Sequence, residues 1–363
     1  MSERKYWIGL NLAKGIGPVR FRQLHEFFGT LRDAWEAEPA ELEAAGLDRR
    51  ALRSLLETRA RVDLDAELAR LDKLGIAVLT WDDEEYPPML GALRPVDQAP
   101  PVLYLRGTLT SSDEWALAVV GTRRATPYGR QVTHQRAREL AASGLTVVSG
   151  LARGLDAEAH SAALAAGGRT IAVLASGLDV LYPPEHRQLA ADVMQCGAVI
   201  SMFPLGTMPA PANFSARNRL ISGLARGVLV TEAGDKSGAL ITARHALEQG
   251  REVFAVPGNI TAQGSTGTNR LIQDGAHPVL SAQDVLDVLK LEHVAAYTSA
   301  REQLPAMGDD ERAVLAQLSA EPLHVDELVN HVRLPVSAVN SALVTLELKG
   351  MVRRVGALMY VRA

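Results

Sequence analysis

The feature that most limits the fold of this chain is a series of six short apolar runs, each ending at or just before a glycine or proline. The runs cover residues 118–121, 146–150, 170–177, 198–203, 227–234 and 252–258. Segments of helical length separate them. Strands buried on both faces read as continuous apolar runs, and their alternation with helices is typical of a parallel sheet. The sequence therefore predicts a Rossmann-like α/β domain with a doubly wound, mostly parallel sheet over residues 76–292.

The region before this series has helical spacing of apolar residues and no strand-like alternation. It predicts a small all-helical domain, of the SAM-like or helix-hairpin-helix-like kind, over residues 1–75. Its turn Gly15–Pro18 (GIGP) resembles the hairpin of helix-hairpin-helix modules, where glycines free backbone N–H groups for a phosphate. The alternative is a glycine turn in a helical domain that contacts protein.

The C-terminal part reads as three helices followed by a hairpin, which is a winged-helix pattern. We expect this domain over residues 309–363, after a linker at 293–308 that loses periodicity. On the expected third helix, Val339, Leu343 and Leu346 share one face.

Winged helices bind duplex DNA or contact proteins, and this one is poor in cations. The third helix carries one lysine, and the wing adds two arginines: Lys349, Arg353 and Arg354. Because a duplex needs its phosphates neutralised, protein contact is the favoured interpretation, and duplex binding stays an alternative.

Composition limits the function further. The 363 residues carry a net charge of −4 and a single cysteine, Cys196, which excludes an intramolecular disulfide and a cysteine-cluster zinc site. No signal-peptide pattern and no apolar stretch of membrane-spanning length is present, so we expect a cytoplasmic protein that does not enter a membrane.

Arginine clusters locally within this acidic chain. In the run LAVVGTRRATPYGR (117–130), Arg123 and Arg124 follow a buried strand and the turn residue Gly121. Ligands of open α/β sheets bind at the carboxyl ends of the strands. Two cations at this edge predict an anionic ligand, with Gly121 and Thr122 close to it.

The second run, SGLARGLDAEAH (149–160), repeats this arrangement with Gly150, Arg153 and Gly154. We favour phosphate contact here over plain turn glycines. Asp156 and His160 lie four residues apart, on one face of the expected helix. They could form an acid/base pair or bind a metal, but without a third ligand or a nucleophile at suitable spacing we favour a structural hydrogen bond.

Two further runs add an aromatic ring and more cations. NFSARNRL (213–220) holds Phe214 beside Arg217, Asn218 and Arg219, and an aromatic next to cations suits single-stranded nucleic acid. The alternative for the phenylalanine is a hydrophobic staple.

EAGDKSGALITARHA (232–246) places Lys236, Ser237 and Gly238 at a helix start, which is an anion site. Glu232 could be a glycosidase-like carboxylate, yet no partner acid is evident.

A nicotinamide or flavin cofactor is not expected. The first strand of the glycine series is followed by GTRRATPYG rather than GxGxxG, and the second ends in VVSG with no acid for a ribose. We expect no cofactor, no metal and no catalytic residue.

Together these motifs resemble the DprA/Smf family of DNA-processing proteins. The resemblance rests on VVGTRRATPYG, VVSGLARGLDAEAH, TIAVLASGLDVLYP, FSARNRLISGL, EAGDKSGALITARHA, VFAVPGN and GTNRLIQDGA. It implies a non-enzymatic Rossmann-like protein that binds single-stranded DNA without sequence preference, protects it and loads RecA in natural transformation. Family members commonly form homodimers through this domain.

The resemblance also implies roles for particular residues. Gly121, Thr122 and Arg123 match the family's phosphate contact, whereas Phe214, Arg217 and Arg219 match its aromatic and basic FxxRNR element. Lys236, Ser237 and Gly238 match its SG helix start. This chain departs from the family at Met202, where a glutamate is usual, and at Pro184, where other members carry a lysine.

One enzymatic alternative remains open. Related Rossmann-like phosphoribohydrolases cleave the glycosidic bond of nucleoside monophosphates with a PGGxGT loop and a glutamate. The comparable stretch here, EAGDKSGALIT, lacks PGG.

Overall fold

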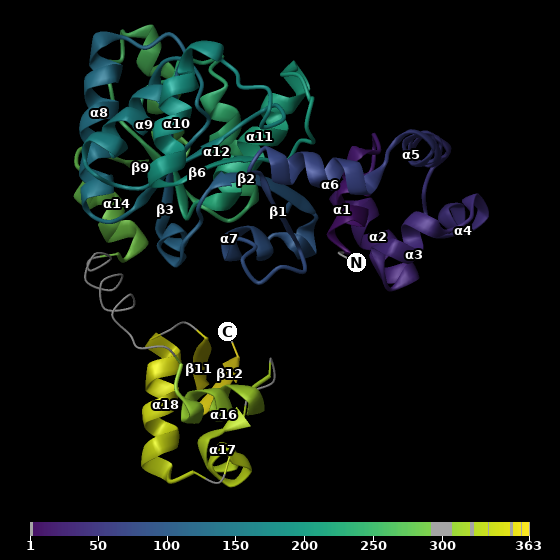
Figure 1. Cartoon of the computed structure of the whole chain (residues 1–363). Coiled ribbons are helices and arrows are strands. Elements are labelled where there is room, and N and C mark those ends of the chain that lie inside the picture. Colours follow the sequence, from purple (N-terminus) through teal and green to yellow (C-terminus); the bar gives the residue numbers. More distant parts are fainter. Residues whose placement is uncertain are drawn as a thin grey trace. The chain divides into compact units, whose positions relative to one another are not determined.

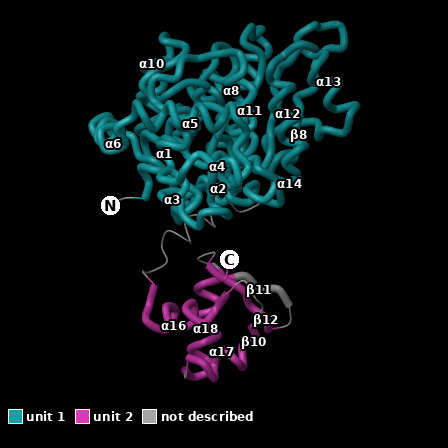
Figure 2. Tube along the Cα trace, turned by 90° about the vertical axis from the view of Figure 1, so that its right-hand side faces the viewer, with its two compact units in different colours: residues 1–292 teal, residues 293–363 magenta. Residues whose placement is uncertain are grey.

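The computed structural model contains two compact units, residues 1–292 and 293–363, which are coloured separately in Figure 2. The ranges that the structure describes are 3–291, 307–319, 323–332, 334–348, 351–356 and 358–362. Most of the expected linker at 293–308 lies outside them. None of the helices in these ranges combines the length and the apolar character needed to cross a bilayer.

Six helices begin the first unit: α1 (Arg4–Leu12), α2 (Pro18–Phe28), α3 (Leu31–Glu36), α4 (Pro39–Ala44), α5 (Arg49–Arg61) and α6 (Leu64–Lys73). Their core contains Phe21, whose ring stacks on Trp7 at 5.7 Å and meets the edge of Trp81 at 6.4 Å. Because Trp81 directly follows β1 (Ala77–Thr80), this aromatic cluster attaches the helices to the edge of the sheet. Figure 1 shows α1 and α6 next to β1.

The turn Gly15–Pro18 joins α1 to α2. Its carbonyl at Gly15 accepts a hydrogen bond from Arg20, and the same guanidinium pairs with Asp48. The Arg20 side chain, which contacts this hairpin, is therefore engaged within the helical region itself.

The large sheet has nine strands: β1 (Ala77–Thr80), β2 (Val102–Gly107), β3 (Ala116–Val120), β4 (Thr146–Ser149), β5 (Thr170–Val173), β6 (Ala198–Ser201), β7 (Gly227–Val230), β8 (Glu252–Ala255) and β9 (His277–Pro278). Their order is β1-β2-β6-β5-β4-β3-β7-β8-β9. Strands β3 to β9 run parallel, and β2 pairs antiparallel with both β1 and β6. The predicted parallel sheet is confirmed, with an added antiparallel edge.

Helices connect the strands in the expected alternation: α7 (Pro88–Gly91), α8 (Pro127–Ala142), α9 (Leu155–Ala165), α10 (Arg187–Cys196), α11 (Pro211–Leu224), α12 (Ala239–Glu248), α13 (Thr266–Gln273) and α14 (Ala282–Leu289). Right-handed crossovers place α8, α9 and α10 side by side on one face and the pair α11 and α12 on the other.

Strand β3 lies at the point where the direction of the winding reverses. From β3 the chain proceeds outward through β4, β5 and β6, and then returns to form β7 on the opposite side of β3. Val120 is opposite Val230 in the β3–β7 register. In open α/β sheets this reversal opens a crevice at the carboxyl ends of the strands, where ligands bind.

The second unit is a winged helix, as predicted. It comprises α16 (Asp309–Gln317), β10 (Leu323–His324), α17 (Val325–Val332), α18 (Val336–Leu348), β11 (Val352–Gly356) and β12 (Met359–Arg362), with the strands in the order β10-β12-β11. Val339, Leu343 and Leu346 are fully buried in its core. Lys349 and the side chains of Arg353 and Arg354 lie outside the described residues.

The aromatic cluster generates a stability prediction. Replacing the fully buried Phe21 by alanine leaves a cavity beside Trp7 and Trp81, so the free energy of unfolding should fall by about 3–5 kcal/mol. Chemical denaturation followed by tryptophan fluorescence measures this change. Phe27→Ala is the matched control on the same helix, because Phe27 is 54% exposed, and it should cost less than about 1 kcal/mol. Equal losses in the two variants would contradict the assigned core.

Candidate nucleic-acid interface

The crevice beside β3 contains a cavity of about 330 Å³, which we call the strand-end cavity. Its wall includes the β3–α8 turn and the first turns of α12, and α11 contributes from the side. Most of the predicted site residues line it: Gly121, Thr122, Arg123, Arg124, Arg217, Asn218, Lys236, Ser237 and Gly238. The structure thus brings together residues 121–124, 217–218 and 236–238, which belong to three separate motifs of the sequence.

The turn after β3 is held rigidly by its neighbours. Thr122 N donates to Glu232 O at 2.8 Å, and Arg124 N donates to Thr122 Oγ1 at 3.2 Å. The Glu232 carboxylate is buried and accepts from both N and Oγ1 of Thr126, at 3.0 and 2.7 Å. Glu232 therefore serves to hold the β3–α8 loop, and the exposed guanidinium groups of Arg123 and Arg124 project from a fixed base.

Charge in the strand-end cavity is strongly positive. Four cationic side chains line it against one acid, Asp156. The amino end of α12 opens into the same space, because Gly238 and Ala239 also line the cavity. A helix N-terminus adds partial positive charge and N–H donors. This combination suits a phosphate group.

A buried ion pair forms the floor. Arg217 and Asp156 are 3% and 6% exposed, and their nearest N and O atoms are 3.7 Å apart. Burial lowers the pKa of Arg217 and raises the pKa of Asp156, while each partner opposes the shift of the other. The Nε and Nη1 atoms of Arg217 have no hydrogen-bond partner among the described residues. Arg217 thus has N–H groups beneath the cavity that can donate to a bound ligand.

The two glycines of the second run have packing roles. A Cβ at Gly150 would lie 1.1 Å from Arg217 Nη1, so only glycine leaves room for that guanidinium. Gly154 has φ +84° and caps α9, and a Cβ there would lie 2.4 Å from Thr122 O. Gly154 lets the start of α9 approach the turn after β3.

An aromatic recess adjoins the strand-end cavity. Phe214, Tyr182, Arg123, Arg153 and Gly150 are among its lining residues. The Arg123 guanidinium lies over the Phe214 ring, 4.7 Å from its centroid, and Tyr182 meets the same ring edge-on at 6.2 Å. Phe214 is only partly buried, so its ring contributes to this recess as well as to the start of α11.

Two predicted cations, Arg153 and Arg219, lie outside the strand-end cavity. Arg153 is exposed and forms an ion pair with Glu185, which raises the pKa of Arg153 and lowers that of Glu185. At the position where the resemblance implies a lysine, this chain thus has the uncharged Pro184, followed by the acid Glu185. Arg219 is exposed on α11 and lines neither the cavity nor the recess.

Tyr182 is the residue that sequence reasoning missed. It follows β5 in the stretch LDVLYPP and is 38% exposed. The signal was available, since an aromatic after a parallel strand belongs to the same edge of the sheet as Arg123. Its contact with Phe214 depends on the loop after β5, which no spacing rule specifies.

The expected hydrogen bond between Asp156 and His160 is wrong. His160 Nδ1 lies 2.7 Å from Thr170 Oγ1, whose own proton goes to Val147 O at 2.7 Å. The Thr170 hydroxyl therefore accepts, and His160 Nδ1 donates. Although the two residues share a helix, Asp156 turns to Arg217 and His160 to the strands. No group of three or more potential metal-ligating side chains gathers in the ranges that the structure describes.

The winged-helix unit shows an acidic surface beside its third helix. A cavity of about 430 Å³ is lined by the first turn of α16, with Asp309, Asp310 and Glu311, and by Ser341 and Thr345 of α18. Three acids next to the expected recognition helix oppose contact with duplex phosphates.

Comparison with known proteins identifies the family. Residues 77–290 match the family model described as DNA recombination-mediator protein A, and residues 298–357 match the DprA winged helix domain. The chain belongs to the DprA/Smf family. It is 35% identical to Protein Smf of Synechocystis sp. over 99% of both chains, and 38% identical to Protein Smf of Escherichia coli over 88% of both.

Two solved structures of the family support the same conclusion. DprA from Streptococcus pneumoniae has a TM-score of 0.68 and 35% identity, covering 78% of this chain and 97% of its own. DNA processing protein A from Helicobacter pylori, whose structure concerns a single-stranded DNA binding mode, has a TM-score of 0.53 and 32% identity, covering 60% and 97%. The resemblance inferred from the motifs is confirmed.

The environment of His160 generates a pH prediction. Burial lowers the pKa of His160 from 6.5 to about 3, with His186 and Arg217 adding to the shift. Below pH 6.5 the unfolded chain binds a proton that the folded chain does not, so the free energy of unfolding falls as the pH falls. At about pH 5.5, His160 alone should lower the free energy of unfolding by about 1.4 kcal/mol relative to its value at neutral pH.

The His160→Gln variant isolates this contribution, because glutamine can donate to Thr170 Oγ1 but does not titrate. Denaturation curves at pH 7.5 and 5.5 should show a smaller loss for the variant than for the original chain. Identical losses would show that His160 titrates normally in the folded state.

Proposed function

We propose that this protein binds single-stranded DNA without sequence preference, protects it, and delivers it to a RecA-type recombinase in the cytoplasm during natural transformation and recombination. The observation that carries the DNA-binding proposal is the strand-end cavity, where Arg123, Arg124 and Lys236 meet the amino end of α12. The similarity to the Helicobacter pylori protein, whose structure concerns single-stranded DNA binding, adds support.

The chemistry of the two adjoining spaces fits one strand of nucleic acid. Cations and a helix N-terminus suit the phosphates, and the ring of Phe214 offers a surface on which a base can stack. Both interactions are indifferent to base identity. Affinity should therefore depend on salt far more than on sequence.

We propose no catalytic activity. The two buried acids near the strand-end cavity have structural partners: Glu232 holds the loop at Thr126, and Asp156 faces Arg217. A phosphoribohydrolase needs a carboxylate free to act on the sugar. Incubation with nucleoside monophosphates, followed by chromatography, should release no base, and clear turnover would establish the enzymatic alternative.

We also propose a homodimer formed through the Rossmann-like domain, on the strength of the family resemblance. Two strand-end cavities on one dimer would engage the same strand at two points and raise the overall affinity by effective concentration. Light scattering at micromolar protein should then report a dimer, and a monomer under these conditions would exclude the arrangement.

Arg123→Ala tests the DNA site. The change removes a guanidinium that lines both spaces and lies over Phe214, so affinity for a fluorescent oligo-dT should fall roughly tenfold to a hundredfold. The slope of log affinity against log salt should become shallower by about 0.7. Fluorescence anisotropy measures both quantities. Arg138→Ala is the matched control, because Arg138 is exposed on the last turns of α8, far from the strand-end cavity, and should change neither. Unchanged binding by Arg123→Ala would mean that DNA binds elsewhere.

Delivery to a recombinase needs its own measurement. The full-length protein should shorten the lag in filament assembly by a RecA-type recombinase on DNA coated with single-strand binding protein. The Arg123→Ala variant should shorten it less, because it holds the strand more weakly. If the protein binds the strand but leaves the lag unchanged, the delivery proposal fails while the binding proposal stands.

A further inference from the structure

A second cavity, of about 270 Å³, lies at the edge of the sheet opposite the strand-end cavity. One wall is the segment 84–89, which includes the first residues of α7, and the other is the segment 109–114 before β3. Its floor is formed by Ile171 at the start of β5 and Leu224 at the end of α11. Because the parallel strands begin here and end at the strand-end cavity, the two sites lie on opposite edges.

The walls of this cavity are anchored in place. Arg251 Nη2 donates to Met89 O at 2.7 Å, and Arg226 Nε donates to Glu114 O at 2.8 Å. Arg169 binds Asp113 through two hydrogen bonds of 2.9 and 2.8 Å. The arginines that fix the walls stand behind them and do not line the cavity. A site held in this way loses little free energy to reorganisation when it binds.

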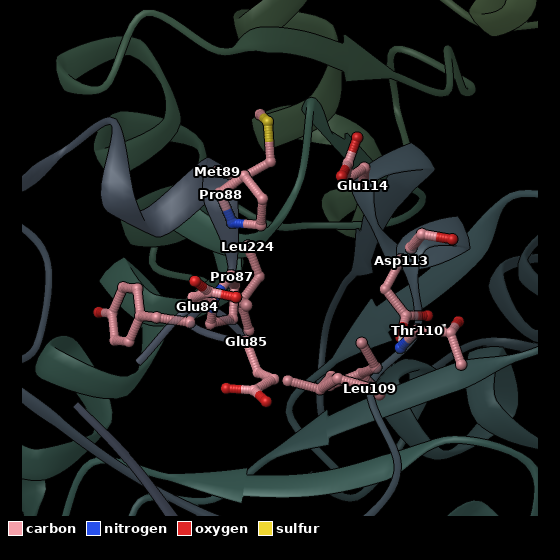
Figure 3. Close-up of a pocket in the computed structure, with 13 residues that line it drawn as sticks. Glu84, Glu85, Pro87, Pro88, Met89, Leu109, Thr110, Asp113, Glu114 and Leu224 are labelled. Atoms are coloured by element: carbon pink, nitrogen blue, oxygen red, sulfur yellow. Dashed lines mark hydrogen bonds between the residues drawn. The ribbon is translucent and has the colours of Figure 1, made fainter. Parts of the chain in front are cut away.

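The lining combines apolar side chains with an acidic rim. Met89, Leu109 and the prolines of the first wall surround the floor, and Figure 3 shows carboxylates on both sides of the space. Glu84 and Glu85 are exposed on one wall, and Glu114 belongs to the other. The lining includes no lysine, arginine or histidine. We call this site the acidic groove.

This charge is opposite to that of the strand-end cavity and repels nucleic acid. It attracts a cation that also carries apolar surface. We propose that the acidic groove docks a segment of a partner protein in which an apolar side chain stands next to lysine or arginine. The apolar side chain fills the space above Ile171 and Leu224, and the cation meets Glu84 and Glu85. Since the groove and the strand-end cavity lie on opposite edges, the partner and DNA bind at the same time.

The test uses a fluorescein-labelled peptide with the core Lys-Leu-Leu-Arg between glycine-serine flanks and measures anisotropy against the full-length protein. We expect saturable binding that persists when the strand-end cavity is filled with oligo-dT. A peptide with glutamate in place of lysine and arginine, and one with serine in place of leucine, should both bind at least about tenfold more weakly.

Two variants locate the binding. Glu84→Lys/Glu85→Lys reverses the charge of the rim without touching the buried floor and should weaken binding by about tenfold. Glu43→Lys/Glu57→Lys is the matched control, since both glutamates are exposed on α4 and α5 and change the net charge equally. No binding, equal weakening by the two variants, or displacement of the peptide by oligo-dT would overturn the proposal. DNA binding by the Glu84→Lys/Glu85→Lys variant should stay unchanged and serves as the check on folding.

Discussion

The pairing of β3 with β7 is the interaction on which the rest of the site depends. It joins Val120 to Val230 and continues past the strands, where Thr231 N donates to Val120 O and Thr122 N to Glu232 O. These bonds align the turn after β3 with the turn after β7. Without them, the arginines of one motif and the lysine of another would stand on separate loops, and no shared cavity would form.

Beneath that cavity, the fold places a charged pair where water is excluded. Removing Arg217 and Asp156 from water is costly, and an N–O distance of 3.7 Å recovers only part of the cost. An ion pair of this kind contributes little to stability. The pair is neutral as a whole, and the cations above it give the cavity a net positive charge. An incoming phosphate would relieve this imbalance. The floor therefore prepares the site for an anion, and the acidic groove at the opposite edge is suited to a cation.

Much of the fold could be predicted because strand and helix patterns are local. Every run of the glycine series became a parallel strand, and the winged helix followed from the order of three helices and a hairpin. The antiparallel edge formed by β1 and β2 was not predicted, since pairing between distant strands leaves no local mark. The same limit explains the error at His160: spacing within a helix shows which residues share a face, but not which neighbour each side chain meets.

The sequence by itself determined the order of the elements, the family and the positions of the cations in the motifs that follow β3, β4, β6 and β7. Only the tertiary structure decided how those cations differ. Arg123 stands exposed over Phe214, Arg217 is buried against Asp156, and Arg153 is engaged by Glu185. The physical reason is that burial and ion pairing depend on contacts between residues far apart in the chain. Three arginines with similar sequence contexts thus differ in burial and in charged partners once β3, α9 and α11 pack together.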